Sequence, residues 1–221
     1  MRRDGLNPRV LIALLVLVVV AGGVALLTVG GSSSSSGSKA KTVSASTTKV
    51  AYRAEAELSP PSAAPPIVLH NYLGQPVNLA SYKGKALLVT FLYTNCPDVC
   101  PLITSNLRVA QNLMGPKVAA KAQIIAVSVD PKGDTPKAVA SFLAHHEMTG
   151  RMQYLVGDAH ELARVWKAWG VGSERDAQQP QFINHSGLIY GITASGKRTT
   201  VYSASFKPAD IAHDVPLLAA R

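Results

Sequence analysis

The sequence predicts an α/β fold with a mostly parallel central sheet and an antiparallel edge. Strand-like and helix-like segments alternate over most of the chain. Two continuous apolar runs, residues 86–93 and 123–129, have the composition of strands buried on both faces. Residues 182–193 and 199–203 are joined by a Ser-Gly turn, which indicates an antiparallel pair.

The N-terminal part of the chain predicts a membrane anchor. Residues 10–29 are apolar and uncharged, and a helix of that length spans roughly the 30 Å of a bilayer's hydrocarbon core. Arginines precede this run, so the positive-inside rule places residues 1–9 in the cytoplasm and the later residues outside it. A cleaved signal peptide is the alternative, but its apolar region is usually shorter, about 7–15 residues. We therefore expect an uncleaved, single-pass transmembrane helix in the cell membrane.

Residues 30–66 have the composition of a tether. The stretch GGSSSSSGS is typical of flexible linkers, and the Ala-, Ser- and Thr-rich residues after it offer little to bury. The paired prolines Pro60-Pro61 and Pro65-Pro66 stiffen the end of this tether. Residues 67–221 remain for one domain of ordinary size.

The formal net charge of +9 does not indicate a nucleic-acid-binding protein. Up to Arg53 there are seven basic residues and one acidic residue, whereas the remainder has fifteen basic and twelve acidic residues. The excess basicity therefore lies beside the predicted membrane segment, where anionic lipid attracts it. We find no basic patch interleaved with aromatic residues, so we expect no nucleic-acid partner.

The predicted domain begins with a β-hairpin, because a turn at residues 71–74 separates two short strand-like segments. The first buried strand leads to a helix over residues 101–114, which Gly115-Pro116 ends. The remaining expected elements are a strand at 152–156, helices at 136–147, 158–169 and 207–220, and a polar loop at 170–181.

Several polar and aromatic residues have simple structural interpretations. Asp130 and Asp134 precede the second helix and are expected to cap it, with Thr135 as an alternative cap. Trp166 and Trp169 are three positions apart on a helix, which favours packing over ligand binding.

The two cysteines of the chain lie in one short segment, Cys96-Pro97-Asp98-Val99-Cys100, between the first buried strand and the first helix. Ligands of open α/β sheets tend to bind at that end of a strand. Pro101 suits the first helical position, so Cys100 is the expected N-cap, where the helix dipole favours a thiolate. A static disulfide is one alternative, but so short a loop gains little entropic stabilisation from a bridge. Redox chemistry or metal binding explains the position better.

A histidine ligand would separate metal binding from redox chemistry. The chain has six candidates: His70, His145, His146, His160, His185 and His213. All but His185 fall on predicted helices or the edge hairpin without a partner motif. His185 follows the polar loop at the start of a strand that could lie beside the first strand. From the residues alone, its role stays open.

The segment TNCPDVCP (residues 94–101) resembles the Cys-Pro-Asp-Val-Cys-Pro signature of the Sco/SenC family of copper chaperones. The FLYT before it, SVDPKGDTP at residues 128–136 and the His-Ser at 185–186 match other landmarks of that family in order. The 89 positions between Cys96 and His185 are also typical of it. The resemblance covers essentially all of residues 67–221.

The resemblance implies a thioredoxin-like fold, with a central mixed sheet flanked by helices, in which Cys96, Cys100 and His185 bind copper. In the family an Asp commonly precedes the histidine. Here Asn184 stands there, which weakens any carboxylate effect on the imidazole but removes no ligand. Asp98 is not expected to be a ligand. Two thiolates and an imidazole suit Cu(I) in a three-coordinate site, and a Cys96–Cys100 disulfide would not bind it.

By the same resemblance, we expect a metallochaperone rather than an enzyme. Its partner would be the binuclear copper centre in subunit II of cytochrome c oxidase, or another copper-accepting protein. The alternative is a thiol–disulfide oxidoreductase that reduces partner cysteines during oxidase assembly. A peroxidase of the peroxiredoxin kind fits the close second cysteine poorly.

Overall fold

The computed structural model describes residues 51–179 and 183–221. The predicted anchor at residues 10–29 and the tether up to residue 50 lie outside these ranges. Within the described ranges, no helix combines the length and the apolar character needed to cross a membrane.

The centre of the sheet is parallel, as predicted. Strands β4 (Ala86–Leu92), β5 (Ala122–Ser128) and β6 (Met152–Val156) pair in that order, and every residue of β4 is buried. The continuous apolar run of β4 follows from its position, because a central strand covered on both faces has no solvent side.

Antiparallel strands extend the sheet on both sides of this centre. On one side lie β9 (Ile189–Ile192) and β10 (Lys197–Tyr202), which confirms the antiparallel pair. The first strand is shorter than the predicted 182–193, so His185 lies in a loop before β9 and not at the start of that strand. On the other side, β2 (Val68–Asn71) and β3 (Pro76–Asn78) form the predicted hairpin. In the described residues the full order is β1-β10-β9-β4-β5-β6-β2-β3.

The edge strand β1 (Ala56–Ala63) corrects the predicted end of the tether, because it pairs with β10. Its sequence, AELSPPSA, is almost wholly exposed and contains two prolines, so it lacks the alternation that marks a strand. An edge strand tolerates proline because the N–H groups on its outer side need no partner. The pairing register between β1 and β10 also shifts between Glu57 and Ser62, the stretch that contains both prolines.

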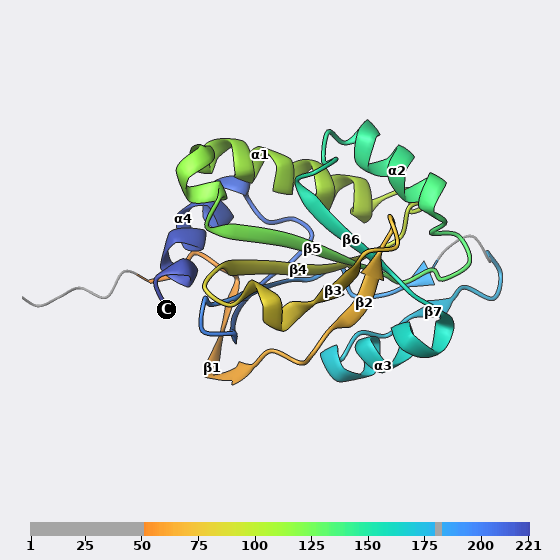
Figure 1. Ribbon diagram of the computed structural model, residues 1–221, viewed down its shortest axis with the longest axis horizontal. Helices are drawn as coiled ribbons and strands as arrows, with labels where there is room; N and C mark the ends of the chain where they lie inside the picture. Colours follow the sequence, from red (N-terminus) through yellow and green to blue (C-terminus); the bar gives the residue numbers. More distant parts are fainter. Residues whose placement is uncertain (1–50, 180–182) are drawn as a thin grey trace, which may run out of the picture. The chain divides into compact units, whose positions relative to one another are not determined.

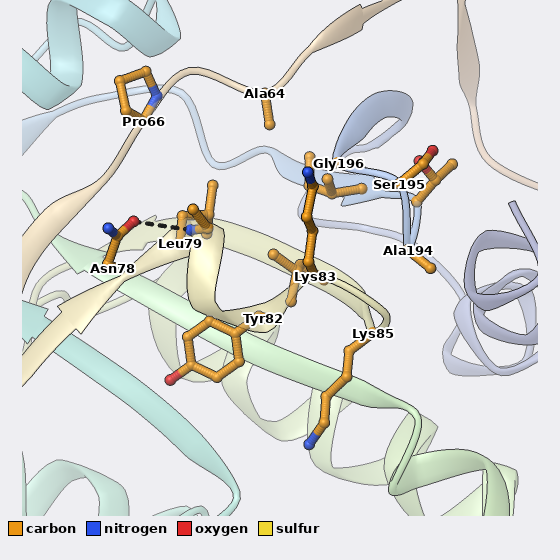
Figure 2. Close-up of a pocket in the computed structure, with 14 residues that line it drawn as sticks. Ala64, Pro66, Asn78, Leu79, Tyr82, Lys83, Lys85, Ala194, Ser195 and Gly196 are labelled. Atoms are coloured by element: carbon orange, nitrogen blue, oxygen red, sulfur yellow. Dashed lines mark hydrogen bonds between the residues drawn. The ribbon is translucent and has the colours of Figure 1, made fainter.

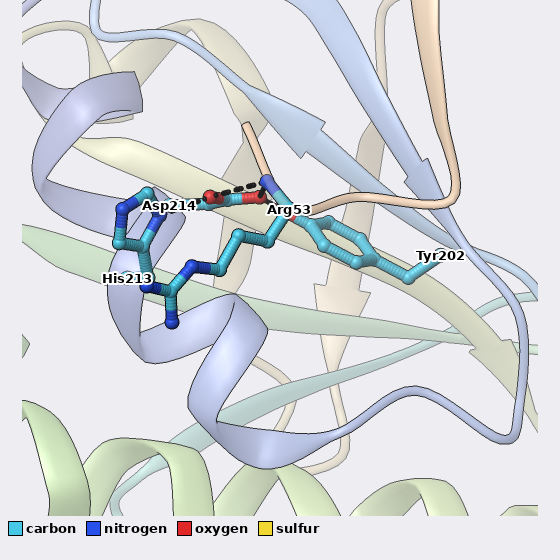
Figure 3. A network of polar contacts seen from close by, with 4 residues as sticks. All are labelled: Arg53, Tyr202, His213 and Asp214. Atoms are coloured by element: carbon cyan, nitrogen blue, oxygen red, sulfur yellow. Dashed lines mark hydrogen bonds and ion pairs between the residues drawn. The ribbon is translucent and has the colours of Figure 1, made fainter. Parts of the chain in front are cut away.

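A buried carboxylate fixes the chain just before β1. Both oxygens of Asp214 accept the backbone N–H of Arg53 at 2.9 Å. Asp214 also accepts the Tyr202 hydroxyl and pairs with Nδ1 of His213, each at 2.8 Å (Figure 3). This network accounts for His213, and together with the pairing of β1 it shows that the folded unit already includes Arg53.

Four helices of the described part cover the sheet: α1 (Val99–Ala119), α2 (Pro136–His145), α3 (Ala159–Trp169) and α4 (Pro208–Ala219). Figure 1 shows α1 and α2 on one side of the sheet and α3 on the other. Right-handed crossovers explain this, because β4, β5 and β6 advance in one direction and their connections stay on one face. Helix α4 packs against α1 and β4 on that face.

The start of α1 differs from the prediction. The helix begins at Val99 with Asp98 at the N-cap, so Cys100 lies inside the first turn rather than capping it. The predicted stop is confirmed, because Gly115 has a φ of 68° and interrupts the helix before a short continuation. Thr135, whose side chain accepts the Ala138 N–H, caps α2.

Candidate metal centre

The loop between β4 and α1 brings the two cysteines together. Both are free thiols, with Cys96 7% and Cys100 0% exposed. The sulfur of Cys96 accepts the backbone N–H of Cys100 at 3.4 Å. The N–H groups in the first turn of a helix have no acceptor within that helix. A sulfur at the helix N-terminus can therefore accept hydrogen bonds from them.

The two thiols have opposite acidities. The Cys100 thiol donates a hydrogen bond that, with the N–H groups of Asp98 and Cys100, lowers the pKa of Cys96 from 9.0 to about 6, although burial opposes the shift. The same hydrogen bond to Cys96, together with burial and the negative Cys96, raises the pKa of Cys100. The prediction of a thiolate at Cys100 is therefore wrong: Cys96 faces the helix N-terminus and ionises, while Cys100 stays protonated in the core.

His185 approaches from a separate loop. It follows β8 (Ile183–Asn184), which pairs with β7 (Glu174–Arg175) in a small second sheet. Its Nε2 lies 3.9 Å from the Cys100 sulfur, and its Nδ1 lies 3.3 Å from the Ser186 carbonyl. A proton on Nδ1, donated to that carbonyl, leaves the Nε2 lone pair directed at Cys100. Burial lowers the pKa of His185, which favours the neutral imidazole that a metal needs.

The separation of Cys100 and His185 fits a shared metal ion. Zinc bonds to sulfur at 2.3 Å and to imidazole at 2.0–2.1 Å, and two such bonds at 120° place the donor atoms about 3.8 Å apart. The observed 3.9 Å is close to that value. Within residues 51–179 and 183–221, however, no three His, Cys, Asp or Glu side chains have a geometry that could hold a metal as they stand. A three-ligand site therefore requires a side-chain movement around this pair.

Tyr93 joins the two halves of the site, and the sequence analysis missed it. Its hydroxyl accepts the backbone N–H of Ile183 at 3.3 Å and is hydrogen-bonded to the Cys96 sulfur. Its ring meets the His185 ring edge-on, with 5.8 Å between centroids. The signal in the sequence was its place at the end of the apolar run, three residues before Cys96.

Asp134 does not cap α2; its carboxylate forms hydrogen bonds that hold the start of the cysteine loop. One carboxylate oxygen accepts the Thr94 N–H at 2.8 Å, and the other accepts the hydroxyls of Ser128 at 2.6 Å and Tyr154 at 2.8 Å. Burial raises the pKa of Asp134. The capping interpretation was wrong because the strand-to-helix loop turns this carboxylate inward. Asp130 likewise turns to its own loop and accepts the Lys132 N–H at 3.3 Å.

A separate hollow lies beside Leu87 near the start of β4, whereas the cysteine loop follows the end of that strand. Figure 2 shows residues that line this hollow. It has a volume of about 240 Å³, and Tyr82, Lys83 and Lys85 line it beside apolar and backbone groups. No cysteine or histidine lines it, so it is not part of the candidate metal centre.

Comparisons with known proteins identify the family of the chain. The family model described as SCO1/SenC matches residues 55–220. The chain is 30% identical over 128 residues to the mitochondrial protein SCO2 homolog of Bos taurus, covering 56% of this chain and 47% of that protein. The match thus spans about half the length of this curated relative.

Solved structures show the same fold. The structure of Bradyrhizobium japonicum ScoI with copper bound is 30% identical, with a TM-score of 0.62 over 71% of this chain and 99% of that one. BsSco is a member of the Sco family of cytochrome c oxidase assembly proteins in which a disulfide switch has been identified. It is 26% identical to this chain, with a TM-score of 0.59, and the match covers 72% of this chain and 95% of that one. The fold is thioredoxin-like, and the chain belongs to the SCO1/SenC family.

Proposed function

We propose that this protein is a copper chaperone that binds Cu(I) through Cys96, Cys100 and His185. The observation that carries the proposal is the 3.9 Å approach of the His185 Nε2 to a sulfur that is itself hydrogen-bonded to a second, acidic thiol. The copper-bound ScoI structure, 30% identical over its fold, supports copper as the metal.

The donor set suits a metal that must be passed on. Two sulfurs and one imidazole are soft to borderline donors, which favour Cu(I), whereas a structural zinc site would use a fourth ligand. The thiol state controls loading, because a Cys96–Cys100 disulfide leaves no thiolate to bind the ion.

The recipient, in our proposal, is the binuclear copper centre in subunit II of a cytochrome c oxidase. The relationship to an oxidase assembly protein supports this. Residues 10–29 would hold the chain in the membrane, with the copper-binding domain outside the cytoplasm. The support for that topology is the apolar length and the arginines that precede it.

A thiol–disulfide oxidoreductase is the second candidate. It is favoured by the unequal thiols, since a Cys96 with a pKa of about 6 is an ionised nucleophile at neutral pH and Cys100 is placed to resolve a mixed disulfide. The related BsSco has a disulfide switch.

Cu(I) titration of the reduced full-length chain against a competing chelator tests the first proposal. We expect one bound Cu(I) per chain, and His185→Ala should weaken binding strongly. His160→Ala, on α3 away from the cysteine loop, is the matched control and should bind as the parent does. Unchanged affinity in His185→Ala would contradict the three-ligand site.

Support of oxidase assembly by His185→Ala separates the two candidates, and its thiol–disulfide exchange with a small disulfide is the control. If reduction of partner cysteines is the main role, His185→Ala keeps its exchange rate and supports oxidase assembly in cells. If copper delivery is the role, the same variant keeps exchange but loses support of assembly.

A further inference from the structure

A second group of metal-ligating side chains lies beside the cysteine loop. A hollow of about 540 Å³ has one wall made by that loop and the start of α1 and another made by the end of α2. Its lining residues are Thr94, Asn95, Pro101, Ala138, Ser141, Phe142, His145 and His146. It contains neither cysteine nor His185, so it is distinct from the site described above.

The two histidine rings have a spacing that fits a shared ion. Their centroids are 5.0 Å apart, and the rings meet in a T-shaped contact at 89°, so a shared ion requires a ring to rotate until one nitrogen of each faces it. Imidazole nitrogens bond to zinc at 2.0–2.1 Å, which puts each ring centre about 3.2 Å from the metal. At a tetrahedral angle, the two ring centres would then be about 5 Å apart.

A hydrogen bond at Nδ1 of His146 can leave its other ring nitrogen, Nε2, free to bind a metal. Its Nδ1 lies 3.2 Å from the Ser105 hydroxyl, and a proton donated from Nδ1 to that oxygen leaves Nε2 with a free lone pair. Histidines that bind metals commonly donate their other ring N–H in this way. Burial, then the neighbouring His145 and Arg108, lowers the pKa of His146, so the ring stays neutral.

The second histidine is open to solvent. His145 is exposed and makes no side-chain hydrogen bond to any described residue, so its ring is available. Both histidines stand at the C-terminal end of α2, where the helix dipole favours positive charge. The nearby Arg108 is opposed by Glu147, whose carboxylate lies 3.4 Å from it.

We propose that His145 and His146 form a second metal site for a divalent cation of the Cu²⁺ or Zn²⁺ class, beside the cysteine loop. Two imidazoles suit these ions, and water in the open hollow completes the coordination shell. Without thiolates, the site would hold its ion more weakly than the cysteine pair does.

The test uses the full, untagged chain with the first site removed by Cys96→Ser, Cys100→Ser and His185→Ala. Titration with Cu²⁺, followed by electron paramagnetic resonance, should show one ion with hyperfine coupling to two nitrogens. Adding His145→Gln and His146→Gln should abolish that signal. The matched control, His70→Gln with His160→Gln, should leave it unchanged.

Ser105→Ala in the same background gives a second readout. It keeps both ligands but removes the partner of His146, so Cu²⁺ affinity should fall about 10-fold. Circular dichroism checks that each variant is folded. The proposal is overturned if the background chain binds no Cu²⁺, or if binding persists after both histidines are replaced.

Discussion

The two halves of the candidate metal centre are held in very different ways. The cysteine half lies between a wholly buried strand, β4, and the first turn of α1. The Asp134 carboxylate accepts the Thr94 N–H and so holds the start of this loop in place. The histidine half follows a two-residue strand in a two-stranded sheet. Isolated hydrogen bonds tie this half to the main sheet region: Ser173 to the Val129 carbonyl, Ile183 to Tyr93, and Thr90 to the Leu188 carbonyl.

The proposed site would therefore combine a firmly held donor pair with a more loosely supported third donor. Core packing and a buried carboxylate determine the cysteine positions. The histidine position depends on the edge-on contact with the Tyr93 ring and on single hydrogen bonds, each with a typical net contribution of about 0.5–1.5 kcal/mol. A chaperone must hold its metal and also release it, and the weaker half is where release can begin.

The largest expected effect comes from the support under the cysteines. Asp134→Ala leaves the Thr94 N–H and two buried hydroxyls without their acceptor, so the free energy of unfolding should fall by about 3–5 kcal/mol. Asp134→Asn keeps the shape, and the hydroxyls of Ser128 and Tyr154 can turn to accept from its amide. Urea denaturation should show a much smaller loss for Asn, and equal losses would argue against the network.

The acidity of Cys96 is the next test. In the reduced chain, its alkylation rate should rise with pH around a midpoint of about 6. Cys100→Ala removes the donor that stabilises the thiolate, so the midpoint should move to higher pH. Cys100→Ser retains a donor and serves as the control. A midpoint unmoved by the alanine would show that the helix N–H groups and the Tyr93 hydroxyl set the pKa without Cys100.

Tyr93→Phe removes the link between the halves. Loss of one hydrogen bond of about 1 kcal/mol at the histidine loop should lower Cu(I) affinity about fivefold. The melting temperature should fall by only about 2–4 °C, because the ring and its packing remain. Tyr190→Phe, which removes a hydroxyl from the neighbouring β9, is the control. Equal affinities for the two variants would place the coupling elsewhere.

The smallest effect is expected at the edge of the histidine half. Ser173→Ala removes a hydrogen bond of 3.1 Å to the Val129 carbonyl, which should cost about 0.5–1.5 kcal/mol in unfolding free energy. Cu(I) affinity should stay within twofold of the parent value, because Ser173 precedes β7 and touches neither sulfur. A larger loss of affinity would mean that this bond positions His185.

The sequence could predict the parts of the fold that depend on local patterns. The apolar run of β4, the hairpin turn after Asn71 and the break at Gly115 each carry a local signal, and each is confirmed. Strand β1 carried none, because an exposed edge strand with two prolines gains its structure only from pairing with β10.

The same division holds for the site. Cys96 and Cys100 were found because they share a loop, but which of them ionises depends on which sulfur faces the helix N–H groups, and that is a three-dimensional fact. Tyr93 and Asp134 look like a strand end and a helix cap in sequence. Their roles come from partners 90 and 40 positions away.

The unequal burial of the two sulfurs also sets an order of events. Cys96 retains slight exposure and Cys100 has none, so in the proposed function a donor protein or an oxidised partner would meet Cys96 first. Binding of the metal ion would start at the Cys96 sulfur and would be complete when Cys100 loses its proton. Release of the metal ion would follow the reverse order, and the Cys96 sulfur would be the last ligand to dissociate from it.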